Sequence, residues 1–264
     1  MPIALVTGAG SGIGRVTALT LARAGFDVVV AGRSASRMQQ VIDSITAATG
    51  SAEFMELDLA SLESVRSAAR RFLHSGRRLD VLVNNAGIGV NRRGVTEDGF
   101  EVHFGINHLG HFLLTSELSP VFTKGSRVVS LTSAVHFRAD GIDFSAVRRP
   151  TRSIGLAEYA TSKLANILFI RELARRHPEL WAYAVHPGLV RTKLIPAPLR
   201  ALAGNRMLTP EQGADTVVWC ATSKKVAGES GHYYQHRTRL PPSPAAQDDV
   251  LARELWERSE EWCR

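Results

Sequence analysis

The chain has 264 residues, of which 44% are hydrophobic and 22% charged, and this balance excludes a disordered or fibrous protein. Its net charge of +7 favours anionic partners. No uninterrupted basic run and no interleaved aromatic pattern accompanies that charge, so we expect no nucleic acid as a partner.

One α/β domain routinely holds this length, so residues 1–264 are expected to form a single domain. The two cysteines, Cys220 and Cys263, cannot build a disulfide framework, which fits a reducing, cytoplasmic setting. No apolar run approaches the roughly 20 residues that cross a bilayer, and a predicted strand begins at residue 3, which leaves no room for a signal peptide. We therefore expect neither a membrane partner nor a bound metal.

Strands and helices alternate along the chain. Short β-branched segments predict strands over residues 3–7, 27–31, 52–58, 80–84, 127–133 and 181–186. Apolar residues at spacings near 3.6 predict helices over residues 11–25, 34–50, 61–76, 96–118 and 155–177, and a last amphipathic helix over 245–262. The strands are almost continuously apolar, which indicates a parallel sheet covered on both faces. The predicted fold is α/β, a single Rossmann-type doubly wound parallel sheet of about seven strands with helices on both faces.

A glycine-rich turn joins the first predicted strand to the first helix. Gly8, Gly12 and Gly14 are spaced G-x-x-x-G-x-G, which matches neither the G-x-G-x-x-G register nor a Walker loop. Glycines allow main-chain N–H groups and the positive end of a helix dipole to approach a pyrophosphate. A turn that is glycine-rich for steric reasons alone is the alternative, but its place at the first βα turn favours a bound dinucleotide.

The end of the second predicted strand indicates which dinucleotide binds. An acidic residue there would bond the ribose 2′-hydroxyl of NAD, whereas a basic one would accept the 2′-phosphate of NADP. The chain has Gly32 and Arg33 at this point, with Arg15 on the first turn of the preceding helix. We therefore predict NADP(H) as the cofactor; an Arg33 that is merely exposed is the alternative.

Six motifs occur in the order seen in short-chain dehydrogenases/reductases. They are "TGAGSGIG", "NNAG" at 84–87, Asn107 in "INHLG", Ser133 closing "RVVSLTS", the Tyr159-x-x-x-Lys163 pair, and "HPGLVRTKL" at 186–194. The chain resembles this superfamily over nearly its whole length. Within it, "INHLGHFLLT", "YATSKLANILFIRELARR" and "SPAAQDDVLARELWERSEEW" look like the branch that contains retinol dehydrogenases and WW-domain oxidoreductases.

The Tyr159–Lys163 pair carries a chemical prediction of its own. Residues i and i+4 share one face of a helix, so the ammonium can lie near the phenol. A cation some 5 Å away at an effective dielectric near 20 favours phenolate by about 3 kcal/mol, or roughly two pKa units. We therefore expect the pKa of Tyr159 to be lowered, which would make it a general acid and base near neutral pH. Taken separately, a packed tyrosine and a snorkelling lysine are the alternatives.

The resemblance implies roles for further residues. Asn107, Ser133, Tyr159 and Lys163 would form the catalytic set: Ser133 bonds the substrate oxygen, Lys163 also holds the nicotinamide ribose, and Asn107 completes a proton relay through water. Asn84 is expected to tie strands together. The expected cofactor contacts, from the glycine turn, the second strand and the resemblance, are Gly8, Ser11, Gly12, Ile13, Gly14, Arg33, Asp58, Leu59, Asn85, Ala86, Gly87, Tyr159, Lys163, Pro187, Gly188, Val190 and Thr192.

The substrate side is less defined. Residues 188–206 are expected to form a lid over an apolar substrate, with a permanently docked surface helix as the alternative. Residues 134–158 form a long connection that we expect at the pocket rim, with His136 either a core or rim residue or a substrate contact. If Arg92, Arg93, Arg148, Arg149 and Arg152 converged, they would favour a carboxylate or a substrate tethered to phosphopantetheine.

Three functions follow from these observations. We first expect an NADP(H)-dependent reductase or dehydrogenase acting on a carbonyl or secondary alcohol of a lipophilic or polycyclic small molecule. A ketoreductase for a carrier-bound acyl or polyketide intermediate is the alternative within enzymes, and a non-catalytic NADP(H)-sensing regulator is the alternative outside them. The apolar faces of residues 104–118 and 156–170 resemble those that pair subunits in this superfamily, so a homodimer or homotetramer is expected.

Overall fold

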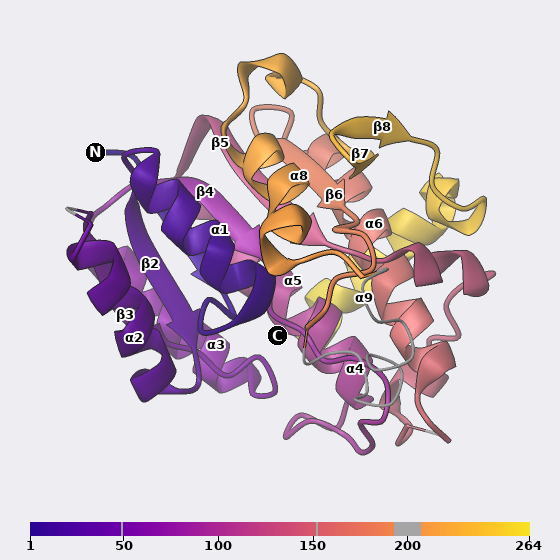
Figure 1. Ribbon diagram of the computed structural model, residues 1–264. Coiled ribbons are helices and arrows are strands. Elements are labelled where there is room, and N and C mark those ends of the chain that lie inside the picture. Colours follow the sequence, from indigo (N-terminus) through magenta and orange to yellow (C-terminus); the bar gives the residue numbers. More distant parts are fainter. Residues whose placement is uncertain (49, 152, 193–206) are drawn as a thin grey trace.

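The computed structural model describes residues 1–48, 50–151, 153–192 and 207–264. Across these residues one sheet of eight strands runs in the order β3-β2-β1-β4-β5-β6-β7-β8 (Figure 1). The strands are β1 (Ile3–Thr7), β2 (Asp27–Gly32), β3 (Ala52–Glu56), β4 (Leu79–Asn84), β5 (Phe122–Leu131), β6 (Trp181–Val185), β7 (His232–Gln235) and β8 (Thr238–Leu240). The predicted parallel sheet is confirmed, with one addition: β8 pairs with β7 in the antiparallel direction.

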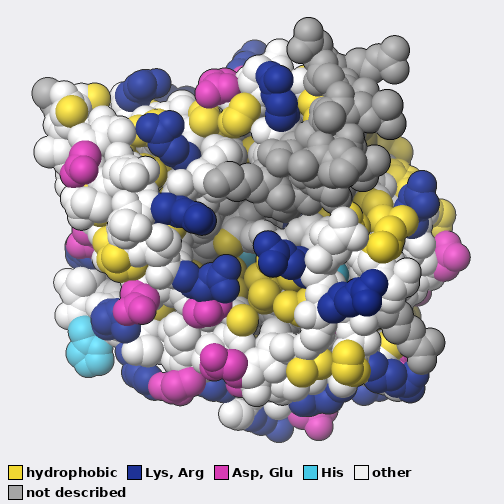
Figure 2. All heavy atoms as spheres, turned by 60° about the horizontal axis from the view of Figure 1, so that its bottom comes forward, with side chains coloured by type: hydrophobic (Ala, Val, Ile, Leu, Met, Phe, Trp, Pro, Cys, Tyr) yellow, Lys and Arg dark blue, Asp and Glu magenta, His cyan; other side chains and the backbone are white. Residues whose placement is uncertain are grey.

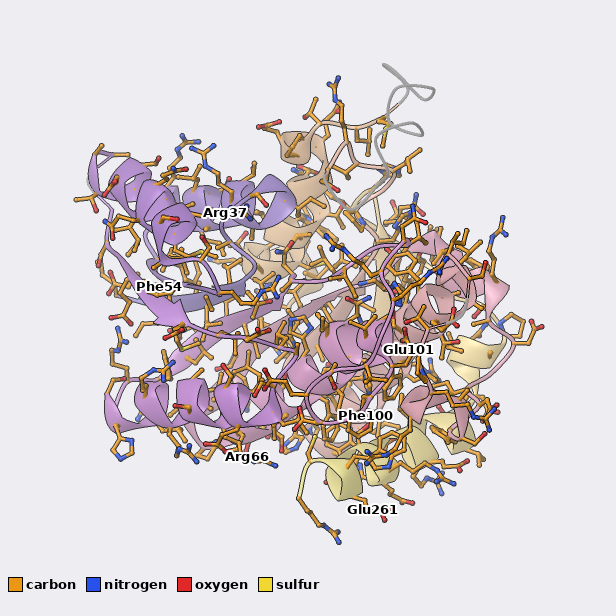
Figure 3. The ribbon with its side chains drawn as sticks, turned by 90° about the horizontal axis from the view of Figure 1, so that it is seen from below. Arg37, Phe54, Arg66, Phe100, Glu101 and Glu261 are labelled. Carbon is orange, nitrogen blue, oxygen red and sulfur yellow. The ribbon has the colours of Figure 1, made fainter. Side chains whose placement is uncertain are left out.

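Helices cover both faces of the sheet because alternate strand residues point to opposite sides. Ala4 and Val6 of β1 belong to the core under α1 (Gly12–Arg23), α2 (Ala35–Thr46) and α8 (Pro210–Thr222). Leu5 belongs to the core under α3 (Leu62–His74), α5 (Gly110–Glu117) and α6 (Leu156–Arg176). Figure 3 shows Arg37 of α2 on one side of the sheet and Arg66 of α3 on the other. The chain is therefore doubly wound, as predicted.

The helix predicted over residues 96–118 is shorter and interrupted. It begins with α4 (Val102–Phe104), because the side chain of Glu101 accepts hydrogen bonds from the main-chain N–H groups of His103 and Phe104. Residues Gly105–Leu109 then form a π-helical turn before α5 continues. Single π turns inside α-helices occur often at functional sites, and this one contains Asn107.

A last helix, α9 (Asp249–Trp262), packs over α5 and α6. It begins four residues later than predicted because the Asp248 side chain caps it. Trp256 lies with its ring centroid 5.0 Å from that of Phe112 and 5.9 Å from that of Phe169. The expected subunit interface was based on the apolar faces of residues 104–118 and 156–170. At Phe112 and Phe169 these faces are covered by α9 of the same chain. The homodimer or homotetramer stays a prediction, without that surface to support it.

Residues 193–206, most of the segment predicted as a substrate lid, lie outside the described residues, as does Arg152. Among the residues that the structure describes, no helix is both long enough and apolar enough to span a bilayer. The cytoplasmic location stays a prediction.

The packing of α9 yields a stability test. Replacing the buried Trp256 by alanine removes its contacts with both phenylalanine rings, so Trp256→Ala should lower the free energy of unfolding by about 3–5 kcal/mol. Val250→Ala on the exposed face of the same helix, where the residue is 70% exposed, should change it by less than about 0.5 kcal/mol. Urea denaturation of the two variants measures both values, and equal effects would contradict the packing role of α9.

Candidate active site

A cleft of about 1330 Å³ lies where the parallel strands end. Every residue predicted for the site lines this cleft except Asn107. Ligand pockets for small molecules are typically about 300–1,000 Å³, so this cleft is large enough for a dinucleotide together with a substrate. Figure 2 shows a hollowed face with hydrophobic side chains at its floor and several Lys and Arg side chains around it.

The glycine turn forms one wall of the cleft, and each glycine is required for a stated reason. Gly8 and Gly12 have φ angles of 67° and 55°, in the left-handed region that favours glycine. At Gly14 a Cβ atom would lie 2.3 Å from Nδ2 of Asn85 and 2.5 Å from the Gly8 carbonyl oxygen. Ser11 precedes α1 without a side-chain hydrogen bond to the helix. The helix N-terminus is thus open to an anion, and the cradle fits a pyrophosphate.

The Thr7 hydroxyl joins this turn to the end of β4. It accepts hydrogen bonds from the N–H groups of Asn85 and Ala86, at 3.0 and 2.9 Å. The Asn85 amide in turn donates to the Thr7 carbonyl at 2.7 Å. Asn84, predicted to tie strands together, instead donates to Thr115 of α5. The tie between strands is therefore made by Asn85, and that expectation for Asn84 was wrong.

His111 completes the environment of Thr7 and was not anticipated. Its Nδ1 bonds the Asn107 carbonyl oxygen at 3.1 Å and its Nε2 lies 2.9 Å from the Thr7 hydroxyl. Burial lowers the pKa of His111 to about 4. The ring is therefore neutral at neutral pH, with Nδ1 donating to the carbonyl and Nε2 accepting from Thr7.

Arg33 stands at the end of β2 as predicted, with its side chain 68% exposed and Nη1 3.8 Å from the Asp58 carboxylate. A side chain at Gly32 before it would require the Met38 side chain to move, because a Cβ atom there would lie 2.4 Å from the Met38 methyl group. Arg37 also lines the cleft, close to Gly10. Sequence reasoning missed Arg37, although its place four residues after Arg33 in the first turn of α2 was a usable signal.

Tyr159 and Lys163 lie one turn apart on α6 and both line the cleft. The Lys163 ammonium lies 5.7 Å from the centroid of the Tyr159 ring and donates to the Leu131 carbonyl oxygen at 3.1 Å. The two side chains therefore share one face, as the spacing predicts.

The prediction that the pKa of Tyr159 is lowered is wrong, because the structure raises it. Burial raises the pKa of the phenol, and a hydrogen bond with Ser133 opposes that rise only in part. Burial also lowers the pKa of Lys163 to about 8. The i, i+4 spacing reports the attraction between ammonium and phenolate but not the loss of water around both groups, which is the larger effect here.

Ser133 follows β5 and is held from behind by a buried histidine. His136 Nδ1 bonds the Ser133 carbonyl oxygen at 2.7 Å, and its Nε2 accepts the N–H of Ser243 at 3.0 Å. Burial lowers the pKa of His136, which keeps the ring neutral in this arrangement. His136 is fully buried and does not line the cleft, which is the core position rather than that of a substrate contact.

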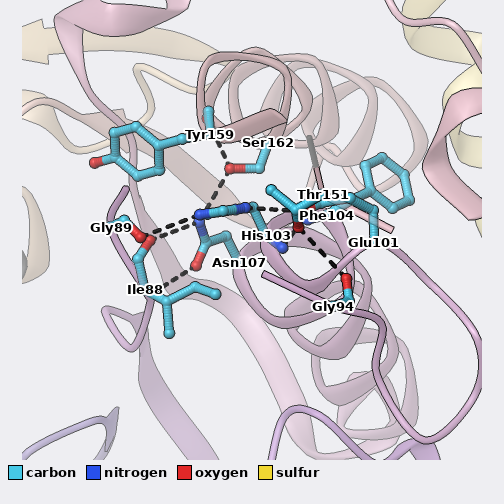
Figure 4. Close-up of polar contacts among 10 residues, drawn as sticks. All are labelled: Ile88, Gly89, Gly94, Glu101, His103, Phe104, Asn107, Thr151, Tyr159 and Ser162. Atoms are coloured by element: carbon cyan, nitrogen blue, oxygen red, sulfur yellow. Dashed lines mark hydrogen bonds and ion pairs between the residues drawn. The ribbon is translucent and has the colours of Figure 1, made fainter. Parts of the chain in front are cut away.

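Asn107 lies beside the cleft rather than in its lining. Its side chain pairs with the main chain of Ile88, accepting from the N–H at 2.8 Å and donating to the carbonyl at 3.1 Å. It also donates to the Ser162 hydroxyl at 3.0 Å, and Ser162 donates to the Tyr159 carbonyl oxygen at 2.8 Å (Figure 4). Asn107 thus connects the segment after β4 to the helix that carries Tyr159.

Among the described basic residues named for the substrate side, Arg92, Arg93, Arg148 and Arg149 do not line the cleft. Arg148 stacks on the ring of Phe100 at 4.0 Å, and Arg149 bonds Ser145. Two other arginines, Arg138 and Arg191, line the cleft and were not anticipated, and neither was His186. Burial lowers the pKa of His186 to about 4, so it is neutral at neutral pH. In the part of the chain that the structure describes, no three His, Cys, Asp or Glu side chains are grouped as metal ligands.

Comparison with known proteins places this geometry in context. Residues 2–198 match the family model described as short chain dehydrogenase. Polyprenol dehydrogenase of Mus musculus is 42% identical over 96% of this chain and 81% of its own length. Retinol dehydrogenase 14 of Homo sapiens is 38% identical over 97% of this chain and 84% of its own length. A short chain dehydrogenase from Burkholderia cenocepacia, solved in complex with NADP, superposes with a TM-score of 0.73 at 28% identity, covering 94% of this chain and 98% of that one.

The burial of Lys163 yields a pH-dependent stability test. Its pKa falls from 10.5 to about 8 on folding, so the unfolded chain holds the proton more tightly. The buried Lys163 therefore lowers the free energy of unfolding by about 3 kcal/mol at pH 7. This penalty disappears as the pH rises from 8 towards 10.5. Lys163→Met should stabilise the chain at pH 7, by up to that amount, and much less at pH 10.

Urea denaturation at the two pH values measures this difference. The Leu131 carbonyl keeps a donor in the variant, because Asn166 also bonds it at 3.0 Å. The exposed Lys224 serves as the control, since Lys224→Met should show no such dependence on pH. A Lys163→Met variant that is less stable than the wild type at pH 7 would contradict a costly buried ammonium.

Proposed function

The chain belongs to the short chain dehydrogenase family and is an oxidoreductase of alcohol and carbonyl groups, and from that premise we propose that it uses NADP(H) to interconvert a carbonyl and a secondary alcohol on a lipophilic small molecule. One observation carries the proposal. A single cleft joins the open glycine turn to Ser133, Tyr159 and Lys163, which brings a pyrophosphate cradle and a proton-transfer group into one site.

The choice of NADP(H) is supported by basic residues at the end of β2. Arg33 and Arg37 both line the cleft, and no acidic side chain stands at Gly32 or Arg33 to bond a ribose 2′-hydroxyl. The structural neighbour from Burkholderia cenocepacia was solved with NADP. When bound, the nicotinamide supplies or accepts the hydride.

The chain's own residues then handle the proton. Because burial raises the pKa of Tyr159, the phenol keeps its hydrogen at neutral pH and is ready to donate it to a carbonyl oxygen. In this role it is the general acid of a reduction. Ser133, hydrogen-bonded to the phenol, offers a second fixed dipole to the same oxygen. Lys163 lies against the ring and would hold the nicotinamide ribose.

A lipophilic substrate is supported by the apolar side chains beside these groups. Ile88, Ile106, Val135 and Leu189 line the cleft. Leu189 is 56% exposed, which leaves apolar surface for a substrate to cover. The names of two relatives specify a polyprenol and a retinol as their substrates. Arg148 and Arg149 make contacts elsewhere, so a carrier-bound acyl chain has no comparable support.

Tyr159→Phe tests the proposed proton transfer. Loss of the hydroxyl should lower kcat by about 10²–10⁴-fold in the reduction of a panel of free lipophilic ketones. Binding of NADPH, followed by its fluorescence, should change little. Tyr234→Phe is the matched control, because that hydroxyl bonds Glu229 at 2.6 Å and does not line the cleft. If Tyr159→Phe retained most of the activity, the assignment of Tyr159 would be wrong.

Arg33→Ala tests the choice of cofactor. A charge-assisted hydrogen bond to a phosphate contributes about 1.5–3 kcal/mol, so the KM for NADPH should rise roughly 10- to 100-fold while that for NADH stays constant. Arg23→Ala, an exposed arginine at the end of α1 that does not line the cleft, is the control. Equal effects of Arg33→Ala on both cofactors would refute recognition of a 2′-phosphate by this residue.

A further inference from the structure

A carboxylate is buried at the start of α4, on residue Glu101, which is only 2% exposed. One oxygen accepts the N–H groups of His103 and Phe104, each at 2.9 Å. The other accepts Nδ1 of His103 at 2.8 Å and the hydroxyl of Thr151. Four donors therefore converge on one carboxylate, which occupies its acceptor sites and stabilises the ionised form.

The ring of His103 lies between two acceptors. Its Nδ1 faces the Glu101 carboxylate, and its Nε2 lies 3.1 Å from the Gly89 carbonyl oxygen. Neither partner has a hydrogen to give, so both ring nitrogens must donate, and a histidine with two donors is an imidazolium. His103 is fully buried, so the pair is a desolvated cation next to a desolvated anion.

The pair connects three segments that meet at the first turn of α6. His103 bonds Gly89 in the segment after β4, and Glu101 bonds Thr151 in the long connection that follows β5. At Gly155, the N-terminal cap of α6, a Cβ atom would lie 2.6 Å from Cε1 of His103. The Gly155 carbonyl accepts the N–H of Tyr159 at 2.9 Å.

Two chains of contacts thus connect residues 88 and 89 to Tyr159, and both are visible in Figure 4. One runs from Ile88 through Asn107 and Ser162 to the Tyr159 carbonyl oxygen. The other runs from Gly89 through His103, whose ring packs edge-on against the Tyr159 ring with centroids 6.1 Å apart. The tyrosine is held between them at its main chain and at its ring.

We propose that the buried, hydrogen-bonded His103–Glu101 pair is a positioning element for Tyr159, which fixes the phenol towards the reacting oxygen by tethering Gly89 to the start of α6. The inference rests on the proposed function, because it takes Tyr159 as the proton donor. Neither residue of the pair lines the cleft. The effect of the pair passes through the geometry of Tyr159 and should appear in kcat more than in binding.

Glu101→Gln offers a conservative variant that keeps the tether without the charges. The amide nitrogen, placed at the Oε1 position, would donate to Nδ1 of a neutral His103 and to the Thr151 hydroxyl. The hydroxyl hydrogen would then turn to the Gly94 carbonyl oxygen, which is 3.4 Å away. His103 would keep its Nε2 hydrogen and its bond to Gly89, so every group stays paired while the buried charges disappear.

Kinetics of three variants separate the tether from packing and charge. Glu101→Gln should keep kcat within about threefold of the wild type. His103→Phe retains a ring against Tyr159 but cannot bond Gly89, and small misplacements of catalytic groups cost up to about 10²-fold. Its kcat should therefore fall roughly 10- to 100-fold, with the dissociation constant of NADPH nearly unchanged. The double variant Glu101→Gln/His103→Phe, which leaves no unpaired buried charge, should lose as much and guards against misfolding of the single one.

The control is His108→Leu, at a buried histidine of the same segment that bonds Ser259 of α9 rather than the residues around Tyr159. It should lower stability but leave kcat of the folded protein unchanged, as a purely structural role would. Nitrogen NMR of histidine-labelled protein gives a readout independent of turnover. It should show hydrogen on both ring nitrogens of His103 in the wild type and on Nε2 alone in Glu101→Gln.

The outcomes are distinguishable. A double variant with wild-type kcat would overturn the positioning role while Tyr159→Phe remained inactive, which would leave the proposed function intact. A loss in Glu101→Gln as large as that in the double variant would show that charge, not the tether, matters, and would also overturn it. A single hydrogen on the wild-type ring would refute the ion pair. An active Tyr159→Phe would remove the proposed function and this inference together.

Discussion

Parallel pairing of β1 with β4, and of β4 with β5 and β5 with β6, brings the ends of four strands to one edge of the sheet. The chain continues from that edge into the glycine turn, the segment 84–89, Ser133 and the segment 186–192, so residues far apart in sequence share one cleft. The Thr7 hydroxyl locks the first two of these together with bonds to Asn85, Ala86 and His111. Every distance at the site depends on this common edge.

Removal of water is the dominant electrostatic effect around that edge. It raises the pKa of Tyr159, lowers that of Lys163 to about 8 and lowers that of His111 to about 4. Each shift favours the uncharged form: Tyr159 and His111 are neutral at neutral pH, whereas Lys163, with a pKa of about 8, stays largely an ammonium. The ionised Glu101 departs from this rule because four donors, one of them the His103 ring, surround its carboxylate. Desolvation sets the protonation states, and local hydrogen bonds make the exceptions.

The sequence predicted the fold class, and all of its predicted site residues except Asn107 line the cleft, because runs such as residues 3–7 and motifs such as Tyr159-x-x-x-Lys163 are local patterns. What it missed depends on contacts between distant residues. The helix at 96–118 begins late because Glu101 caps it, and the short strands β7 and β8 carry no strong apolar pattern, with β8 exposed throughout. The pKa of Tyr159 has the opposite direction because spacing reports a neighbour but not the loss of solvent. Amphipathicity showed that α5 and α6 have an apolar face, not that α9 would cover it.

The docking of α9 also bears on how the chain acquires its structure. His108 and Ser259 meet although 151 positions separate them, and Trp256 of α9 contacts Phe112 and Phe169, which also lie far before it in the chain. Contacts between residues so far apart in the sequence form late in folding, because the entropy of ordering the intervening chain has to be lost first. Until then these aromatic rings face water on a nascent chain, where they invite association with other apolar surfaces. Shielding by a chaperone would be of most value in this interval.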